Sequence, residues 1–205
     1  MGKAISKREQ KKRLYRSAIL DAAVTLFAQK GVHETSIADI MASANLGLGT
    51  FYNYFGSKEE ILMELLKNIV EDIEARLSLL RQEKRETAVV LEDLLLYTAE
   101  LLSKNRFVMP LFLRAAEHAA APSMPPEQAA AKPDRPSAPA FKEIFNTITD
   151  EGQKSGEFRS DIPSGVITEL FHSLFQAAAF STLGLRFEEN IRLKVRIIID
   201  GMKAK

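Results

Sequence analysis

The 205-residue chain lacks cysteine and tryptophan and has only three histidines. Without cysteine it can form neither a disulfide nor a thiolate-ligated metal site, and its histidines are too isolated to suggest a metal centre. It also lacks an apolar run of transmembrane length, and no uninterrupted apolar segment follows the basic N-terminus as in a signal peptide. These absences predict a cytoplasmic protein without a metal or a cofactor and without a membrane partner.

The net charge of +1 conceals an uneven distribution of charge along the chain. Residues 1–58 contain nine lysines and arginines and four acidic residues, whereas the remainder contains 19 basic and 23 acidic residues. A basic N-terminal region followed by a mildly acidic remainder is typical of a protein that binds a polyanion through the basic region alone. The alternative is a flexible basic tail that is merely solvated.

Apolar residues recur at helical spacing along most of the chain, and no alternating strand pattern of useful length is present. We therefore expect an all-α fold, with residues 1–12 disordered. The stretch 119–140 contains six of the eight prolines and is expected to be a mobile loop. The periodicity predicts helices at about 13–30, 35–42, 48–55, 57–81, 87–103, 105–119, 138–155, 163–183 and 187–203.

The ends of the first helices carry recognisable signals. Gly31 is expected to end the first long helix, and Ser36 with Asp39 resembles a capping box at the start of the next. Asn45 lies in a tight turn, where asparagine tolerates the left-handed conformation. Ser57, with a glutamate three residues later, predicts a full capping box at the start of a second long helix.

Two short helices joined by a tight turn, after a longer helix, are typical of a helix-turn-helix DNA-binding unit. In the second short helix, Phe51 and Phe55 are four residues apart and should point into the core. Gly49 would let DNA approach the backbone, Thr50 and the tyrosine hydroxyls could donate to phosphates, and Asn53 could bind adenine. The alternative is a helical hairpin with an aromatic core.

Several blocks of this region resemble the DNA-binding signature of the TetR family of bacterial transcriptional regulators. The resemblance covers residues 13–65 almost continuously and implies a homodimeric regulator, commonly a repressor, that binds a near-palindromic operator and responds to a small molecule. The blocks that carry it are Ile19-Leu20-Asp21-Ala22-Ala23, Leu26-Phe27-Ala28-Gln29-Lys30-Gly31, Thr35-Ser36-Ile37-Ala38-Asp39-Ile40, Gly49-Thr50-Phe51-Tyr52-Asn53-Tyr54-Phe55 and Ser57-Lys58-Glu59-Glu60-Ile61-Leu62.

The resemblance also implies roles for single positions. Thr35 and Lys58 match phosphate-contacting positions of the family, and the second short helix matches its recognition helix. The family's usual turn reads Ala-Gly-Val-Ser, whereas this chain has Gly47 in place of the serine and so lacks a capping hydroxyl. The expected DNA-binding residues are Thr35, Ser36, Leu48, Gly49, Thr50, Tyr52, Asn53, Tyr54 and Lys58.

The domain organisation follows from the same resemblance. We expect a flexible basic tail at 1–12, a helix-turn-helix domain at 13–58, a connecting helix at 59–82 and a ligand-binding and dimerisation domain at 83–205. The last two helices would pair with those of a second copy, although their apolar stripes could equally be intrachain core. The candidate interface residues are Val166, Leu170, Leu174, Ala178, Ile191, Val195 and Ile198.

A ligand pocket would lie among the central helices of this second domain. An aromatic residue at helical spacing is more often core than ligand wall, and the 119–140 loop could gate the pocket or simply be solvated. The candidate lining favours an apolar or aromatic effector and comprises Phe107, Phe112, His118, Phe141, Phe145, Phe171, His172 and Phe175.

Two other classes of function compete with a DNA-binding regulator. An enzyme on a helical bundle would need a recognisable motif, but the chain has no H-E-x-x-H, P-loop or Gly-rich dinucleotide signature, so we expect no catalytic residues. A helical adaptor or membrane-surface protein would use the basic N-terminus as a lipid-binding arm. The expected partners are therefore double-stranded operator DNA, a second copy of the chain and a small-molecule effector.

Overall fold

The computed structural model describes residues 6–113 and 141–204. Within these ranges the regular structure is helical, apart from an isolated bridge between Phe158 and Lys203, and this confirms the all-α fold. The described residues divide into two compact units. The first comprises those up to Leu65 with Asn105–Val108, and the second comprises Leu66–Lys104 with those from Met109 onwards.

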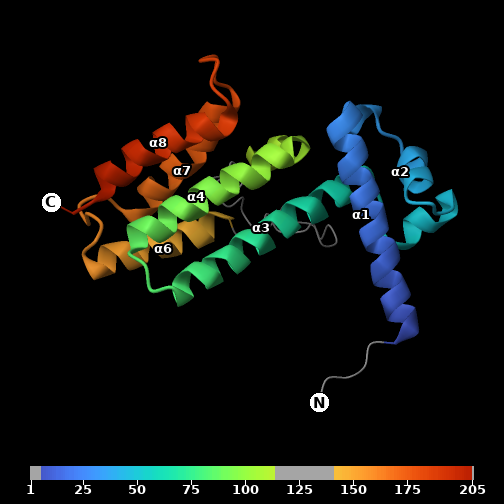
Figure 1. Ribbon diagram of the computed structural model, residues 1–205, viewed down its shortest axis with the longest axis horizontal. Coiled ribbons are helices and arrows are strands. Elements are labelled where there is room, and N and C mark those ends of the chain that lie inside the picture. Colours follow the sequence, from blue (N-terminus) through green and yellow to red (C-terminus); the bar gives the residue numbers. More distant parts are fainter. Residues whose placement is uncertain (1–5, 114–140, 205) are drawn as a thin grey trace, which may run out of the picture. The chain divides into compact units, whose positions relative to one another are not determined.

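The first unit is a small helical domain (Figure 1), and its buried side chains form one apolar core. It consists of α1 (Lys7–Glu34), α2 (Ile37–Ser43), the 3-10 helix η1 (Leu48–Asn53), the start of α3 (Lys58–Gln82) and the short 3-10 helix η2 (Arg106–Val108). The core is built from apolar side chains at helical spacing, as expected for amphipathic helices. Its largest fully buried members include Ile19, Ile40, Met41, Phe51, Phe55 and Ile61.

The first helix begins earlier than its apolar pattern suggests. Ser6 caps α1 by accepting a hydrogen bond from the Glu9 N–H at 3.2 Å, and residues 7–12 are helical and exposed. The expectation of a flexible tail over 1–12 is therefore wrong for these six residues. Lysine, arginine, glutamate and glutamine are good helix formers, but a turn made only of them leaves no apolar pattern to detect.

The local signals between the first helices are confirmed. Gly31 adopts φ 84° and interrupts the helical conformation. Ser36 and Asp39 form a complete capping box at the start of α2, with both hydrogen bonds present. Asn45 adopts φ 54°, the left-handed conformation that the tight turn requires. At the start of α3 the Glu60 N–H donates to the Ser57 hydroxyl, but the Glu60 carboxylate accepts from the Gly56 N–H instead of completing the box.

The second unit is a helical bundle (Figure 1). It contains the rest of α3 together with α4 (Thr87–Lys104), α6 (Phe141–Ser155), α7 (Ser164–Ala179) and α8 (Phe187–Met202). Helix α4 packs against α8 and α6, and α7 packs against both of these helices as well. Residues 109–113 are helical within the expected 105–119 segment, while the 119–140 loop lies outside the described residues.

Candidate nucleic-acid interface

The short helix η1 has a buried face and an outward face. Phe51 and Phe55 are fully buried, with ring centres 6.2 Å apart, which confirms that this pair anchors the segment. The Tyr52 side chain is 67% exposed. Leu48, Gly49 and Asn53 are exposed as well, while Thr50 and Tyr54 are half-buried. The structure thus brings six of the expected DNA-binding residues together on η1 and the residue after it.

A cluster around Arg16 holds the end of η1 against α1. Its guanidinium donates to the Tyr54 carbonyl at 2.9 Å, pairs with the Glu64 carboxylate at 3.2 Å and lies 4.4 Å from the centre of the Phe55 ring. The Tyr15 ring lies 6.3 Å from that of Tyr54. These contacts join residues far apart in the sequence, so spacing alone carried no signal for them.

The glycines at the start of η1 leave it open to a ligand. Gly47 is the N-cap residue and contributes no side-chain hydrogen bond, in agreement with the missing capping hydroxyl. A Cβ atom on Gly49 would meet nothing within 4 Å, so the protein's own packing does not require glycine at this exposed position. Close approach of an external group is a physical reason for a glycine there.

An ion pair between Lys30 and Asp39 lies at the N-terminus of α2. The Asp39 carboxylate accepts hydrogen bonds from the Lys30 ammonium at 2.7 Å and from the Ser36 N–H at 2.9 Å. The bond from Lys30, followed by those from Ser36, holds the pKa of Asp39 well below its usual range. The carboxylate is therefore ionised throughout the neutral range, and Ser36, which is exposed, lies beside a fixed ion pair.

Thr35 has a different environment from the one implied by the family resemblance. Its side chain is fully buried, and its hydroxyl donates to the Gly31 carbonyl at 2.7 Å. A phosphate cannot reach this hydroxyl in the conformation described, so the expected contact through the Thr35 side chain is corrected. The hydroxyl instead satisfies a backbone carbonyl at the turn between α1 and α2.

Lys58 also has a structural role that the sequence did not reveal. Its ammonium donates to the carbonyls of Val32 at 2.8 Å and Thr35 at 2.6 Å, and so ties the start of α3 to the turn after α1. An ammonium carries three protons, so one donor remains beyond these two bonds. The phosphate contact expected of Lys58 stays a prediction.

Lys58→Met should lower the free energy of unfolding of the first unit by about 1–2 kcal/mol, because two half-buried carbonyls lose a charged donor. The substitution keeps the length and helix propensity of the side chain. Denaturant unfolding measures the change, and Lys67→Met, at an exposed site of α3, is the matched control. Unchanged stability in Lys58→Met would contradict the structural role.

In the second unit, five of the expected pocket residues form one aromatic cluster. The ring centres of Phe112 and Phe141 lie 4.7 Å apart, and those of Phe141 and Phe145 lie 4.6 Å apart. Phe175 stacks edge-on against Phe112 at 5.5 Å, and Phe171 lies 6.0 Å from Phe145. The rings contact one another directly, so in this conformation they form core rather than the wall of an open pocket.

The remaining pocket candidates lie in different places. His172 is half-buried, with its ring centre 5.9 Å from that of Phe112, and so joins the edge of the cluster. Phe107 belongs to the first unit, where its ring lies 5.6 Å from Phe27, and its assignment to the pocket is corrected. His118 lies outside the described residues.

Four of the seven residues expected at a dimer interface are instead buried in the core of the second unit, namely Leu174, Ala178, Ile191 and Val195. Residues at i+4 spacing advance by about 40° around a helix with each step, so a row that begins on the surface ends in the core. Val166 and Leu170, at the start of the α7 row, are each 48% exposed. Ile198 is half-buried.

An exposed apolar strip replaces the expected rows. On α7 it runs from Val166 and Leu170 through Ala177 to Phe180, the capping residue, which is 73% exposed. On the neighbouring helix α8 the side chain of Ile197 is 72% exposed. We call Val166, Leu170, Ala177, Phe180, Leu193 and Ile197 the α7/α8 strip. Apolar residues concentrated on neighbouring helix faces are typical of protein–protein interfaces.

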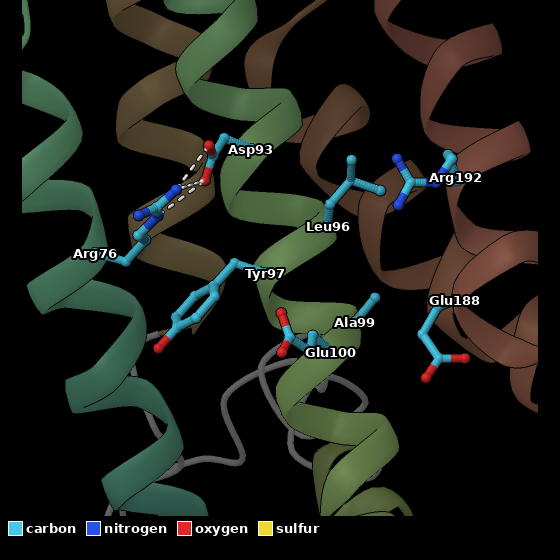
Figure 2. A pocket seen from close by; sticks show the side chains of 8 residues that line it. All are labelled: Arg76, Asp93, Leu96, Tyr97, Ala99, Glu100, Glu188 and Arg192. Atoms are coloured by element: carbon cyan, nitrogen blue, oxygen red, sulfur yellow. Dashed lines mark hydrogen bonds and ion pairs between the residues drawn. The ribbon is translucent and has the colours of Figure 1, made fainter.

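A surface groove of about 370 Å³ lies among α3, α4 and α8 (Figure 2). Arg76 of α3 donates three hydrogen bonds of 2.8–2.9 Å to the carboxylate of Asp93 of α4, and this pairing raises the pKa of Arg76. Glu188 accepts a hydrogen bond from the Ser103 hydroxyl at 2.5 Å. Side chains of both charges line the groove, and the Arg76–Asp93 pair joins α3 to α4 while the Ser103–Glu188 bond joins α4 to α8.

Two absences in the described part of the chain bear on other functions. Within it, no group of three histidine or acidic side chains is arranged to hold a metal ion. None of its helices is both long and apolar enough to cross a membrane. What the described residues do present is a helix-turn-helix unit with its second helix open to solvent, joined in one chain to a helical bundle. Together these features define a helix-turn-helix DNA-binding protein.

Comparison with known proteins finds a family match. The family model of bacterial regulatory proteins of the tetR family matches residues 19–65. The transcriptional repressor KstR2 of Rhodococcus jostii is 26% identical over 147 residues, which are 72% of this chain and 69% of that repressor. The fatty acid metabolism regulator protein of Bacillus subtilis is 33% identical over 85 residues, or 42% of each chain. Residues 19–65, which contain α2 and η1, thus match the TetR family of transcriptional regulators, and the chain is similar to repressors of this kind.

Solved structures agree on the fold. The TetR-family repressor FadR of Thermus thermophilus, in complex with lauroyl-CoA, superimposes with a TM-score of 0.63 at 22% identity, over 93% of this chain and 96% of that one. The ketosteroid transcriptional regulator KstR2 of Mycobacterium tuberculosis gives 0.62 at 19% identity, over 93% and 95%. Because the family and these relatives are transcriptional regulators, the expectation that the chain is not an enzyme is confirmed.

Proposed function

We propose that this regulator is a ligand-responsive repressor that binds a near-palindromic operator as a homodimer. The observation that carries the proposal is the outward face of η1, which is fixed by two buried phenylalanines within the segment that matches the family. A short helix anchored on one face and exposed on the other fits the major groove of DNA. The name of the related Rhodococcus protein supports repression rather than activation.

Contacts to DNA are assigned according to exposure. Tyr52 and Asn53 project from η1 and reach base edges or phosphates, while Leu48 and Gly49 allow close approach. The half-buried Thr50 and Tyr54, together with Ser36 and the third proton of Lys58, form the rim that contacts phosphates. Thr35 is left out of this set because its side chain is buried.

Selection of bound fragments from genomic DNA tests the function directly. A near-palindromic motif is expected, with half-sites about one helical turn, or roughly 34 Å, apart. If purified protein enriches no fragment even at low salt, DNA binding in this form is contradicted.

Tyr52→Ala should weaken binding to the selected operator by about tenfold, or roughly 1.4 kcal/mol, while leaving stability unchanged, because its ring is 67% exposed. A gel-shift titration measures the affinity, and a fragment with a scrambled motif separates specific from non-specific binding. Full affinity in the variant would remove Tyr52 from the interface.

The α7/α8 strip is proposed as the dimer interface. It exposes apolar side chains on two helices that pack against each other, and pairing with the same strip of a second copy would form a four-helix contact. The same patch on both subunits is what two-fold symmetry requires. Such a dimer would present two η1 helices to successive major grooves.

Leu170→Glu combined with Ile197→Glu should convert a dimer into a monomer, because each charge would be buried without a partner at the interface. Sedimentation measures the mass, and operator affinity should fall by about tenfold or more when one half-site contact is lost. Leu79→Glu, also at an exposed leucine of the second unit, is the matched control and should stay dimeric. A dimeric double variant would place the interface elsewhere.

The effector site is proposed at the aromatic cluster of the second unit. Phe112, Phe141, Phe145, Phe171 and Phe175 offer an apolar environment, and His172 lies at its edge. Since these rings contact one another, a ligand must separate them in order to bind. A ligand that binds the separated state more tightly than the packed state shifts the conformational equilibrium toward the separated state. The lauroyl-CoA complex of FadR supports a ligand with a long apolar chain.

Two probes distinguish the effector class. Lauroyl-CoA represents an acyl ligand and resorcinol a compact aromatic one, the latter being the ligand of the structurally similar regulator RolR. Calorimetry should show that the wild type binds one of the two probes and that Phe145→Ala binds it more weakly. The same probe should release operator DNA from the wild type. Binding that is unaffected by Phe145→Ala would contradict this location.

A further inference from the structure

Four of the five basic side chains in the first two turns of α1 lie on one face. At about 100° per residue, Lys7, Arg8, Lys11 and Lys12 fall within roughly 140° of arc, with Tyr15 near its middle. The acidic residue of these turns, Glu9, lies outside this arc. We call these four cationic side chains the α1 basic face.

The α1 basic face continues into the contacts that hold η1. The Lys11 ammonium lies 5.3 Å from the centre of the Tyr15 ring, and that ring lies 6.3 Å from the ring of Tyr54. The next residue along the chain, Arg16, donates to the Tyr54 carbonyl at 2.9 Å. The basic face therefore begins where the exposed helix η1 ends.

Packing within the protein does not account for this arrangement. Residues 7–14 are exposed along their whole length, and the side chain of Leu14 is 68% exposed. Lys7 with Lys11 and Arg8 with Lys12 are like-charged pairs four residues apart, and each such pair destabilises a helix. A polyanion bound along this face would turn the repulsion into attraction.

We propose that the α1 basic face binds the sugar–phosphate backbone of DNA beside the bases that η1 contacts. The inference rests on the proposed function, because it requires η1 to face a DNA groove. At about 1.5 Å of rise per residue, the face extends roughly 12 Å from Tyr15 to Lys7, which spans several base pairs of about 3.4 Å each. It lengthens the protein's footprint without adding sequence specificity.

The salt dependence of binding tests the proposal. The full-length variant Lys11→Gln/Lys12→Gln removes two charges and keeps helix-forming residues. Each phosphate contact contributes about 0.9 to the slope of log affinity against log salt, so the slope should fall by about 1.8 and low-salt affinity by roughly 10- to 100-fold. Circular dichroism verifies that the helix persists.

Two controls match the change in charge. Lys67→Gln/Lys154→Gln removes the same charge from exposed positions of the second unit and should leave the slope unchanged. Arg13→Gln removes one charge from the opposite side of α1 and should have less effect than Lys11→Gln alone. Phosphate ethylation interference should show contacts flanking each half-site that disappear in the Lys11→Gln/Lys12→Gln variant.

The outcomes separate this inference from the function on which it rests. If wild type and Lys11→Gln/Lys12→Gln bind the operator with the same slope, the basic face does not contact DNA and the inference is overturned. It is also overturned if the variant keeps its slope on DNA but loses binding to phosphatidylserine vesicles, since the face then binds lipid. If the wild type binds no DNA fragment at all, the proposed function itself fails.

Discussion

Phe55→Ala should lower the free energy of unfolding of the first unit by about 3–5 kcal/mol, the usual cost of removing a buried phenylalanine ring. The ring is fully buried, lies 6.2 Å from that of Phe51 and supports the Arg16 guanidinium at 4.4 Å. Its loss leaves a cavity beneath η1 and removes one face of the Arg16 site. Denaturant unfolding, followed by circular dichroism, measures the difference.

Tyr52→Ala is the matched comparison for Phe55→Ala. Both substitutions remove an aromatic ring from the same short segment, but Phe55 is buried and Tyr52 is exposed. We expect Phe55→Ala to lose stability, and DNA binding only as the unit unfolds, whereas Tyr52→Ala loses DNA binding without losing stability. If Phe55→Ala unfolds at the wild-type denaturant concentration, the ring is not a core anchor and the orientation of η1 is wrong.

Local chemistry explains why much of the first unit could be predicted from its sequence. Capping at Ser36, the left-handed turn at Asn45 and the helix interruption at Gly31 each depend on a few neighbouring residues. The inward orientation of Phe51 and Phe55 follows from their spacing of four residues. These features are encoded within one or two turns of chain, so no knowledge of the tertiary fold is needed to predict them.

Features that depend on distant contacts could not be predicted in the same way. Lys58 binds carbonyls 23 and 26 residues away, and Arg16 binds a carbonyl 38 residues away. A lysine at a helix start looks the same in the sequence whether it faces solvent or a backbone turn. Thr35 was misassigned for this reason, because burial is a property of the assembled unit.

The dimer candidates show how far periodicity can be extended along a helix. Val166, Leu170, Leu174 and Ala178 share i+4 spacing, but they turn by about 120° in total from the surface to the core. The exposed face of α7 instead alternates steps of four and three residues, through Val166, Leu170, Ser173, Ala177 and Phe180. That alternation keeps a straight seam, as in helices that pair along their length.

Gly152→Ala should destabilise the second unit by about 3 kcal/mol, near the upper end for overpacking a core. A Cβ atom on Gly152 of α6 would lie 2.1 Å from the nearest ring carbon of Phe158, much closer than any real contact. The Phe158 ring is buried, and the Phe158 N–H donates to the Gly152 carbonyl at 2.9 Å, so the ring has little room to move away. In a helix alanine is otherwise favoured over glycine by about 1 kcal/mol, so a Gly→Ala substitution usually stabilises. A loss of stability in Gly152→Ala would be the opposite of that usual effect.

Gly201→Ala in α8 is the control for this sign reversal. A Cβ atom there would meet nothing within 4 Å, and the residue is exposed, so the substitution should be neutral or stabilising by up to about 1 kcal/mol. Thermal and denaturant unfolding of both variants against wild type measure the two effects. Because Arg159, next to Phe158, donates its N–H to the Met202 carbonyl at 2.8 Å, displacement of Phe158 should also loosen the end of α8. Faster hydrogen exchange at the Arg159 amide in Gly152→Ala would reveal that coupling. If Gly152→Ala instead has wild-type stability, Phe158 does not pack on α6.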